Sequence, residues 1–573
     1  MLRLNSFPMV DHLAVYAPSL GLELPNQTFG KDVANRNLYR ALAQLGSLAS
    51  LTWLTADAVD TERLHEVFLE PCTSDRSTPR LLTSNLLDLV SPCQSGLLLR
   101  GQPYLAELAW MRSSFRGNQA YSLVGLIHTL APPAVREQIG AAAVAPVQPW
   151  DALICTSPSV KRAVQNLFDQ WEAHLQQRLG TNRCIRPQLP LIPLGVDLAS
   201  MQASAHDQQA RQQLRQQLGV AEHELLVLWV GRLSYFEKAF PQPLFQALGR
   251  ADQRLGQRLH LAMAGWFPNG DHDQRLYSEA AQVYCPGVPV HVLDGRDQAL
   301  LSRCWAAADV FVSLVDNPQE TFGLSPVEAM AAGLPVLVSD WDGYRYTVRH
   351  GVDGFCIPTL GGAGGGIGDE LAARHSLGLM SYQDYVGAVA QHTAVDVHAA
   401  AAALVQLAQN PELRRRMGEA GRQNVHERFD WPVVIRQYLQ LFDELQQRRQ
   451  AAPDDQTRQL HPLRGNPFDD FAGFATVQLQ PHTRLALAVP QHEALAALER
   501  LTTLDRVYEG CHATLAELQQ LLALIGQHGS SSVEQLLAAA QPARHQSLLM
   551  GLSWLAKLGL LSWSSPEPAH DPG

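Results

Sequence analysis

The fold is decided by the stretch ETFGLSPVEAMAAGLPV, which occupies residues 320–336. It follows the apolar run 310–314 and leads into the apolar run 335–339, so the pattern predicts a strand, a loop, a helix over 327–332 and a second strand. The loop of this unit therefore ends at the N-terminus of a helix. There the unbonded N–H groups of the first turn and the positive end of the helix dipole attract phosphate.

Two carboxylates and a glycine surround the start of this helix. Ser325, Pro326 and Glu328 match an N-cap, a proline at the first helical position and an acid at N3, which predicts a capping box. Gly323 lets the backbone approach a ligand closely. Glu320 and Glu328 flank the same corner, where carboxylates can accept hydrogen bonds from sugar hydroxyls. The alternative is that Glu328 only caps the helix and that Glu320 is a solvated loop residue.

The alternation of short apolar strands with amphipathic helices extends in both directions from this unit. Such alternation predicts an α/β fold with parallel, doubly wound sheets. It restarts after residue 197, so we expect two Rossmann-like domains facing each other across a cleft, with ligands at the carboxyl ends of the strands. The predicted strands lie at 12–17, 51–54, 96–99, 122–127, 152–155, 225–230, 261–264, 290–293, 310–314 and 335–339, and the predicted helices at 35–45, 104–112, 159–179, 207–218, 244–255, 300–308 and 327–332.

The chain divides into four predicted parts. Its 573 residues are enough for about three to five folding units. The first Rossmann-like domain is expected at 1–195, the second at 196–430, and a helix at 431–450. A polar linker with Pro453 then leads to an accessory module at 458–573.

The accessory module is expected to be mainly helical. Residues 532–539, 546–558 and 559–563 read as helix, helix and strand, which resembles a winged-helix module, and a further apolar helix is expected at 514–525. From Asp454 onward the chain has seven Lys or Arg against twelve Asp or Glu, so it lacks the basic face that reading DNA requires. We expect the module to recognise the acceptor or a partner, or else to stabilise the first domain by packing on it.

Composition and motifs exclude several functions. The net charge of −11 opposes binding to nucleic acid. The eight cysteines contain no CxxC pair, which indicates reduced thiols in a cytoplasmic protein rather than a zinc site or a disulfide framework. No segment approaches the ~18 apolar residues that span a bilayer, although peripheral contact with a membrane surface stays open. The glycine-rich stretch 361–368 is predicted to be a surface loop rather than a phosphate cradle, because no lysine-bearing helix start follows it.

A second cluster of charged residues follows the apolar strand 225–230. The segment GRLSYFEK, residues 231–238, places Arg232 and Lys238 beyond the carboxyl end of that strand. Two cations at such a position stabilise the negative charge that develops on a departing diphosphate. The alternative is that both are ordinary surface cations.

The stretch 320–336 resembles the E-x7-E signature of retaining GT-B glycosyltransferases of the family 4, or group 1, type. It has the flanking Phe-Gly-Leu, Glu-Ala-Met-Ala and Gly-x-Pro-Val elements of that signature. The resemblance implies that Glu320 faces the donor sugar and that Glu328 holds the nucleotide ribose. It also implies that the backbone of Phe322, Gly323 and Leu324 donates to the diphosphate.

The same resemblance extends over most of residues 10–449 and implies further site residues. Arg232 and Lys238 would clamp the donor phosphates, although Ala239 stands where the family has a glycine after the lysine. His128 ends a predicted strand; it is either a structural histidine or, as in the family, a neighbour of the transferred sugar. The resemblance places Gly30 in the acceptor-side glycine loop, Gly295 and Arg296 beside the nucleotide base, and the helix 431–450 back on the first domain.

The function implied is the transfer of a sugar, with retention at the anomeric carbon, from a nucleotide-diphosphate donor to an unidentified saccharide, lipid or small-molecule acceptor. The leaving diphosphate assists the incoming hydroxyl, and neither a cofactor nor a metal is expected. Two Asp-x-Asp strings occur, at 271–273 and 340–342. Such strings bind a metal in glycosyltransferases of the other main fold, but here we interpret both as chance occurrences and not as metal sites. Two alternatives stay open: a catalytically inactive sugar-nucleotide sensor, and a GT-B phosphorylase that would require a lysine holding pyridoxal phosphate.

Overall fold

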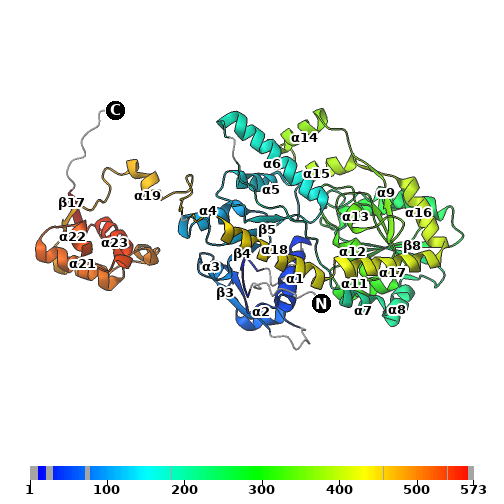
Figure 1. Cartoon of the computed structure of the whole chain (residues 1–573), viewed down its shortest axis with the longest axis horizontal. Coiled ribbons are helices and arrows are strands. Elements are labelled where there is room, and N and C mark those ends of the chain that lie inside the picture. Colours follow the sequence, from blue (N-terminus) through cyan, green and yellow to red (C-terminus); the bar gives the residue numbers. More distant parts are fainter. Residues whose placement is uncertain are drawn as a thin grey trace. The chain divides into compact units, whose positions relative to one another are not determined.

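The computed structural model describes residues 11–20, 30–70, 78–181, 184–455, 457–538 and 540–564. The chain divides into two compact units, Met1–Leu460 and His461–Gly573. The larger unit contains two six-stranded sheets with helices on both faces (Figure 1). The predicted α/β fold with two Rossmann-like domains is therefore confirmed.

The first sheet is parallel throughout, with the strand order β3-β2-β1-β4-β5-β6. This is the Rossmann order, in which β2 and β3 are added on one side of β1 and β4, β5 and β6 on its other side. Its strands and helices are β1 (His12–Tyr16), α1 (Gly30–Leu45), β2 (Ser50–Leu54), α2 (Thr61–Phe68), β3 (Arg80–Ser84), α3 (Ser91–Ser95), β4 (Leu97–Arg100), α4 (Leu105–Phe115), β5 (Ser122–Leu126), α5 (Pro133–Gly140), β6 (Ala152–Ile154) and α6 (Pro158–Leu179).

The second sheet repeats the same parallel order, β12-β11-β10-β7-β8-β9. The apolar run of β7, Leu225–Val230, is buried over its first five residues because helices cover both faces. Its other elements are α7 (Leu198–Ala205), α8 (Gln208–Leu218), α9 (Gln242–Asp252), β8 (Leu259–Gly265), α10 (Asp271–Tyr284), β9 (Val290–Asp294), α11 (Gln298–Ala307), β10 (Val310–Ser313), α12 (Leu324–Ala331), β11 (Val336–Ser339), α13 (Tyr344–Thr347), β12 (Gly354–Ile357), α16 (Val397–Gln409) and α17 (Pro411–Arg428).

The chain crosses between the two domains twice, and the two crossings are hydrogen-bonded to each other. Val196 N donates to Phe429 O at 2.9 Å, and Trp431 N donates to Val196 O at 3.2 Å. The Trp431 ring lies so close to Gly195 that a Cβ on this glycine would lie 2.4 Å from it. Helix α18 (Trp431–Ala451) then packs its apolar face into the core of the first domain, beside α1 (Figure 1).

The smaller unit has a core of its own, formed by leucines such as Leu485, Leu522 and Leu552. Its strands form an antiparallel sheet in the order β16-β15-β17. The predicted helical C-terminal region is present, whereas its resemblance to a winged helix stays a prediction. The elements are α19 (Pro467–Asp470), β15 (Arg484–Leu487), α20 (Gln491–Glu499), α21 (Leu515–His528), β16 (Ser531–Ser532), α22 (Val533–Ala538), α23 (His545–Lys557) and β17 (Leu561–Ser564).

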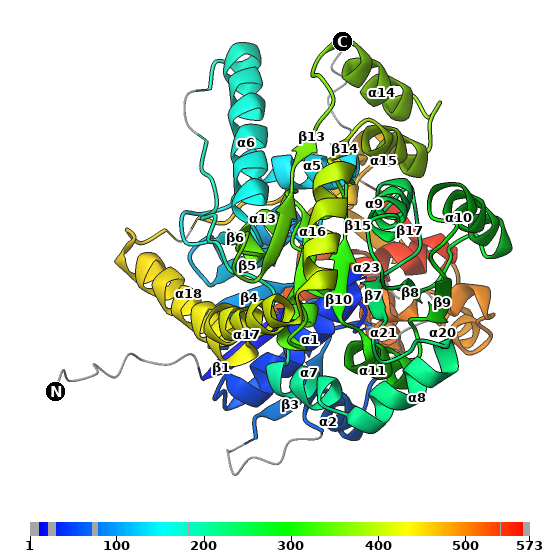
Figure 2. The same ribbon diagram turned by 90° about the vertical axis from the view of Figure 1, so that its right-hand side faces the viewer.

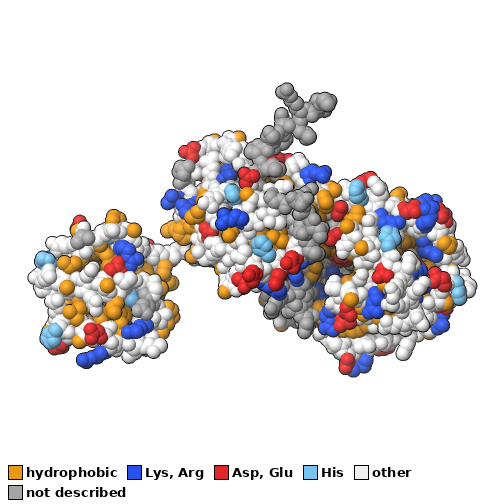
Figure 3. All heavy atoms as spheres, turned by 90° about the horizontal axis from the view of Figure 1, so that it is seen from below, with side chains coloured by type: hydrophobic (Ala, Val, Ile, Leu, Met, Phe, Trp, Pro, Cys, Tyr) orange, Lys and Arg blue, Asp and Glu red, His pale blue; other side chains and the backbone are white. Residues whose placement is uncertain are grey.

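Basic and acidic side chains lie interspersed over the face of the larger unit shown in Figure 3. On the smaller unit several large apolar side chains are exposed, among them Leu463, Phe474 and Leu504, each by at least 82%. No helix in the described part of the chain is both long and apolar enough to cross a membrane.

Candidate functional site

The start of α12 differs by two residues from the predicted one, and this changes the chemistry of the site. The helix begins at Leu324 with Gly323 as its N-cap, and no side chain caps it. The predicted capping box is therefore wrong: Ser325 lies inside the helix. The N–H groups of the first turn are left without a side-chain cap, which is the arrangement that binds anions.

Glycine is required at position 323. Its φ is +85°, which side-chain-bearing residues rarely adopt, and a Cβ there would lie 1.9 Å from Cε1 of Tyr344. Tyr344 in turn shares a hydrogen bond of 2.9 Å with the Ser313 hydroxyl at the end of β10. The turn that begins α12 is thus packed tightly against the neighbouring loop.

Glu320 and Lys238, predicted from two separate motifs, lie together. The Lys238 ammonium donates to a Glu320 carboxylate oxygen at 3.2 Å, and the Glu320 side chain is 14% exposed. Burial alone would raise the pKa of Glu320. The charge and hydrogen bond of Lys238, with the backbone N–H groups of Phe322 and Thr321, instead hold that pKa below its ordinary value. Glu320 is therefore an ionised carboxylate at neutral pH.

Arg232 is held by a carboxylate that the sequence motifs did not single out. Its guanidinium pairs with one oxygen of Glu237, and both side chains are about nine-tenths buried. Gln383, far along the chain, donates to the other oxygen of Glu237 at 3.3 Å. Arg232 is thus an oriented cation rather than a free surface group.

Glu328 sits in the first turns of α12 without a partner. Within the described residues its carboxylate makes no hydrogen bond or ion pair, and burial raises its pKa to about 7. A carboxylate in this state gains most from a ligand that brings hydroxyl donors.

His128 lies at the contact between the two domains. Its Nε2 is 2.8 Å from Oδ1 of Asn35, while the Thr321 hydroxyl donates to the His128 carbonyl at 2.7 Å. Burial, helped by the charge of Lys31, lowers the pKa of His128 to about 4. The imidazole is therefore neutral at pH 7, and the carbonyl of the same residue contacts the loop that carries Glu320.

A second contact between the domains involves Asp342, which the sequence analysis took as part of an incidental string. The Ser157 hydroxyl donates to Asp342 at 2.9 Å, and burial raises the pKa of Asp342 to about 7. Asp342 also has a φ of +35°, an uncommon conformation for a residue other than glycine. In the other string, Asp273 is buried and accepts hydrogen bonds from Asn269, so it has a structural role at the start of α10.

Three further predicted residues lie at the ends of other elements. Gly295 follows β9, where a Cβ would lie 2.8 Å from the backbone nitrogen of Gly265. Arg296 is about half exposed and pairs with Asp294 at 2.8 Å. Gly30 was predicted in a loop, but it is the first residue of α1; residues 21–29, which include the rest of that predicted loop before Gly30, lie outside the described residues.

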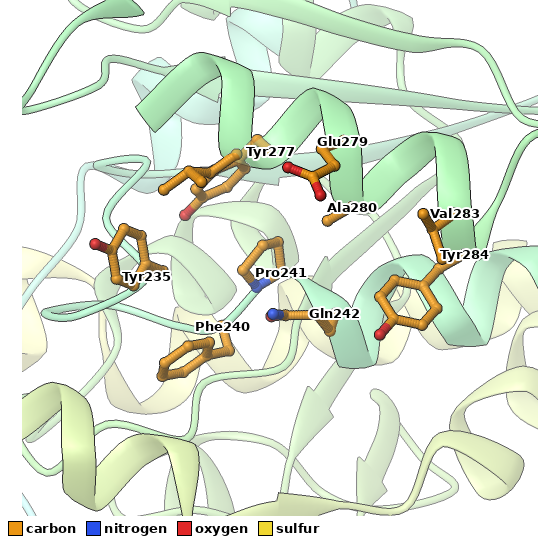
Figure 4. A pocket seen from close by; sticks show the side chains of 10 residues that line it. Tyr235, Phe240, Pro241, Gln242, Tyr277, Glu279, Ala280, Val283 and Tyr284 are labelled. Carbon is orange, nitrogen blue, oxygen red and sulfur yellow. The ribbon is translucent and has the colours of Figure 1, made fainter. Parts of the chain in front are cut away.

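A cavity of about 390 Å³ lies beside the loop that carries Arg232 and Lys238 (Figure 4). Tyr235 and Phe240 contribute to it from this loop, and Tyr277 and Tyr284 from α10. None of the predicted site residues lines it. The cavity is therefore a neighbour of the candidate site and not part of it.

Comparison with known proteins agrees with the E-x7-E resemblance. Residues 210–360 match the family described as glycosyl transferases group 1. The matched stretch includes all six strands of the second sheet and the helix α12. The resemblance to group 1 glycosyltransferases is thus confirmed for residues 210–360, the part of the chain that carries Arg232, Lys238, Glu320 and Glu328.

Two relatives illustrate the similarity. The D-inositol 3-phosphate glycosyltransferase of Geodermatophilus obscurus is 33% identical over 178 residues, which are 29% of this chain and 36% of that protein. The phosphatidyl-myo-inositol mannosyltransferase of Mycobacterium tuberculosis is 28% identical over 283 residues, 49% of this chain and 58% of the relative. The chain thus spans between about a third and three fifths of the length of these relatives.

Solved structures that superpose on this chain include the sucrose-phosphate synthase of Thermosynechococcus elongatus. The alignment covers 76% of this chain and 99% of that one, with 20% sequence identity and a TM-score of 0.45. Another is Anabaena HepE in complex with UDP, with 17% identity and a TM-score of 0.47 over 75% of this chain and 98% of that one.

Proposed function

We propose that the protein is a retaining glycosyltransferase that moves a sugar from a nucleoside-diphosphate donor to an acceptor hydroxyl. The observation that carries this proposal is the Lys238–Glu320 ion pair at the start of α12, with Glu328 in the same helix, which has no partner within the described part of the chain. These groups come from two loops and one helix, and together they match a donor that has a diphosphate, a sugar and a ribose.

In the proposed reaction the diphosphate binds at the N-terminus of α12, on the backbone N–H groups of Gly323 and Leu324, beside that of Phe322, which is directed at the Glu320 carboxylate. Arg232 and Lys238 stabilise the charge that grows on it as the bond to the anomeric carbon breaks. The acceptor oxygen forms its bond on the same face of the sugar, and its proton passes to the departing diphosphate.

The remaining predicted residues have positioning roles in this scheme. Glu320, ionised, faces the sugar, and the neutral His128 lies at the contact between the domains near the transferred sugar. Glu328 accepts hydrogen bonds from the ribose hydroxyls, while Gly295 and Arg296 lie beside the base and Gly30 on the acceptor side. No metal or organic cofactor takes part in this proposal.

The test is a hydrolysis screen in which the full chain is incubated with UDP-, GDP- and ADP-sugars and the released nucleoside diphosphate is measured. Release from one donor class, lowered by about 10²–10³-fold in Lys238→Met, supports the proposal and names the donor. Tight binding without release or transfer would favour the inactive sensor. Because both relatives described above are named for inositol-containing acceptors, inositol phosphates and phosphatidylinositol belong in the acceptor panel.

A further inference from the structure

Residues 361–393, here called the arm, leave the second domain directly after the part that matches the family. Two short antiparallel strands, β13 (Thr359–Leu360) and β14 (Ala394–Val395), close its base. The arm contains α14 (Gly366–Ser376), which begins inside the predicted glycine-rich loop, and α15 (Tyr382–Gln391). The Thr359 hydroxyl donates to Asp340 O at 3.0 Å, which fixes this base to the domain.

The two helices of the arm differ in their burial. Helix α14 has no buried residue, whereas α15 buries Val386, Gly387 and Ala390. Both ribbon views show α14 outside α15 (Figures 1 and 2). The His375 ring stacks on Tyr385 at 5.2 Å and links the two helices. The arm thus rests on the domain through α15.

Helix α15 contacts the loop that carries Arg232 and Lys238. Gln383 donates to Glu237, whose other oxygen pairs with Arg232. Gly387 lies against the same loop, since a Cβ on it would be 3.1 Å from Cβ of Phe236. Gln383 therefore acts on Arg232 through a single intervening carboxylate.

The residue beside Gln383 contacts the loop that carries Glu320. The Tyr382 hydroxyl donates to Oε1 of Gln319 at 2.7 Å. Gln319 directly precedes Glu320, and its own backbone N–H donates to Asn317 Oδ1 at 2.9 Å. The Asn317 amide in turn donates to Phe236 O at 2.8 Å and joins the two loops.

We infer that the arm positions the donor site: Tyr382 and Gln383, neighbours at the start of α15, hold the two loops that present Glu320 and Arg232. Charged groups that stabilise a developing charge act best when they are oriented before the reaction. The inference rests on the proposed function for what the loops bind, but the holding of the loops is a separate property.

The experiment compares Tyr382→Phe, Gln383→Met and the double variant with wild type. Gln391→Met is the matched control, because Gln391 ends the same helix, is exposed, and its side chain makes no hydrogen bond among the described residues. Two readouts are taken on the full chain: amide hydrogen exchange of residues 232–240 and 316–322, and kcat and KM for donor hydrolysis.

In the double variant we expect faster amide exchange of both loops and a kcat/KM lower by about ten-fold. A decrease of about ten-fold is the effect expected when one hydrogen bond to an ionised group is lost. The control should match wild type in both readouts. Unchanged exchange in the double variant would overturn the inference, and so would faster exchange with unchanged kcat/KM. If wild type hydrolyses no donor, the proposed function fails, while the exchange data still decide whether the arm holds the loops.

Discussion

The Ser157 hydroxyl of the first domain donates to the Asp342 carboxylate of the second at 2.9 Å. Burial raises the pKa of Asp342 to about 7, and the charge of Glu320 adds to this effect. An unfolded aspartate has a pKa of about 3.9, so the folded state binds the proton more tightly. The contribution of Asp342 to stability is therefore complete at acid pH and is lost as the pH rises through 7.

Replacing Asp342 by asparagine should remove this loss, because an amide oxygen can still accept from Ser157 and does not ionise. We expect the Tm of Asp342→Asn to exceed that of wild type at pH 8, by about 2–4 °C for each kcal/mol gained in the free energy of unfolding. This difference in Tm should be smaller at pH 5. Thermal unfolding at both pH values checks this. An equal difference in Tm at pH 5 and pH 8 would contradict a raised pKa of Asp342.

Glu328 should make donor binding depend on pH. With a pKa of about 7 in the free protein, it is half protonated at neutral pH, and only the ionised form accepts hydrogen bonds from two ribose hydroxyls. We expect kcat/KM to rise between pH 6 and pH 8 in wild type, and Glu328→Gln to lower it about ten-fold and flatten that rise.

The pH profile of donor hydrolysis is the measurement for Glu328. Glu279→Gln, a change at the neighbouring aromatic cavity, is its control and should behave as wild type. Asp342 also has a pKa of about 7, so the pH profile of Asp342→Asn is measured to distinguish its effect from that of Glu328. A Glu328→Gln profile with the wild-type slope would exclude the ribose role.

The two cations should affect turnover. Arg232→Gln and Lys238→Met each remove a preoriented charge beside the diphosphate, so we expect kcat to fall by about 10²–10³-fold. Arg415→Gln is the control, because Arg415 makes only exposed ion pairs on α17. Steady-state kinetics with the identified donor measure the effect, and wild-type turnover in both variants would disprove the assignment.

A buried ion pair outside the site should matter for stability. Arg112 and Asp151 are fully buried and joined by two hydrogen bonds of 2.6 and 2.8 Å, and Asp151 also accepts from Leu123 N. Arg112→Met leaves the carboxylate unpaired, which should cost about 3–5 kcal/mol in the free energy of unfolding. Urea denaturation checks this, and a loss below about 1 kcal/mol would contradict it.

The smaller unit should be dispensable for donor chemistry. The chain should be cut after Leu460 and not earlier, because Gln119 bonds to Arg449, Ala452 and Asp455 and thereby holds the start of the linker on the first domain. We expect residues 1–460 to hydrolyse donor at the wild-type rate and to lose transfer to the natural acceptor. Full transfer by the shortened chain would refute a recognition role, and failure to fold would make the module structural.

How much the sequence predicts depends on where the determining contacts lie. The strand β7 was predicted residue for residue, because six consecutive apolar residues suit a strand covered on both faces. By contrast β3 was missed, since this edge strand buries only Leu81 fully. The start of α12 was misjudged because Gly323, in its left-handed conformation, ends the loop before the expected cap is reached.

The residues of the candidate site likewise divide into those that a local motif marks and those that only the folded structure reveals. Glu320, Glu328, Arg232, Lys238 and His128 come from contiguous motifs, so sequence reasoning could single them out. Tyr382 and Gln383 matter through contacts across 63 and 146 positions of chain, and no local pattern marks them. Glu237 lies five positions from Arg232 within the motif 231–238, but this motif was interpreted through its two cations alone. Asp342 was dismissed because a short acidic string carries no sign of the hydroxyl it meets on the other domain.

The paired crossings at Val196 and Trp431 have a mechanical consequence. The chain passes between the domains at two points, and backbone hydrogen bonds of 2.9 and 3.2 Å join these two crossings. The Trp431 indole packs directly against Gly195 at the same place. Because the two crossings lie side by side, we expect relative motion of the domains to be a rotation about this one point, where a side chain at position 195 would meet the Trp431 ring.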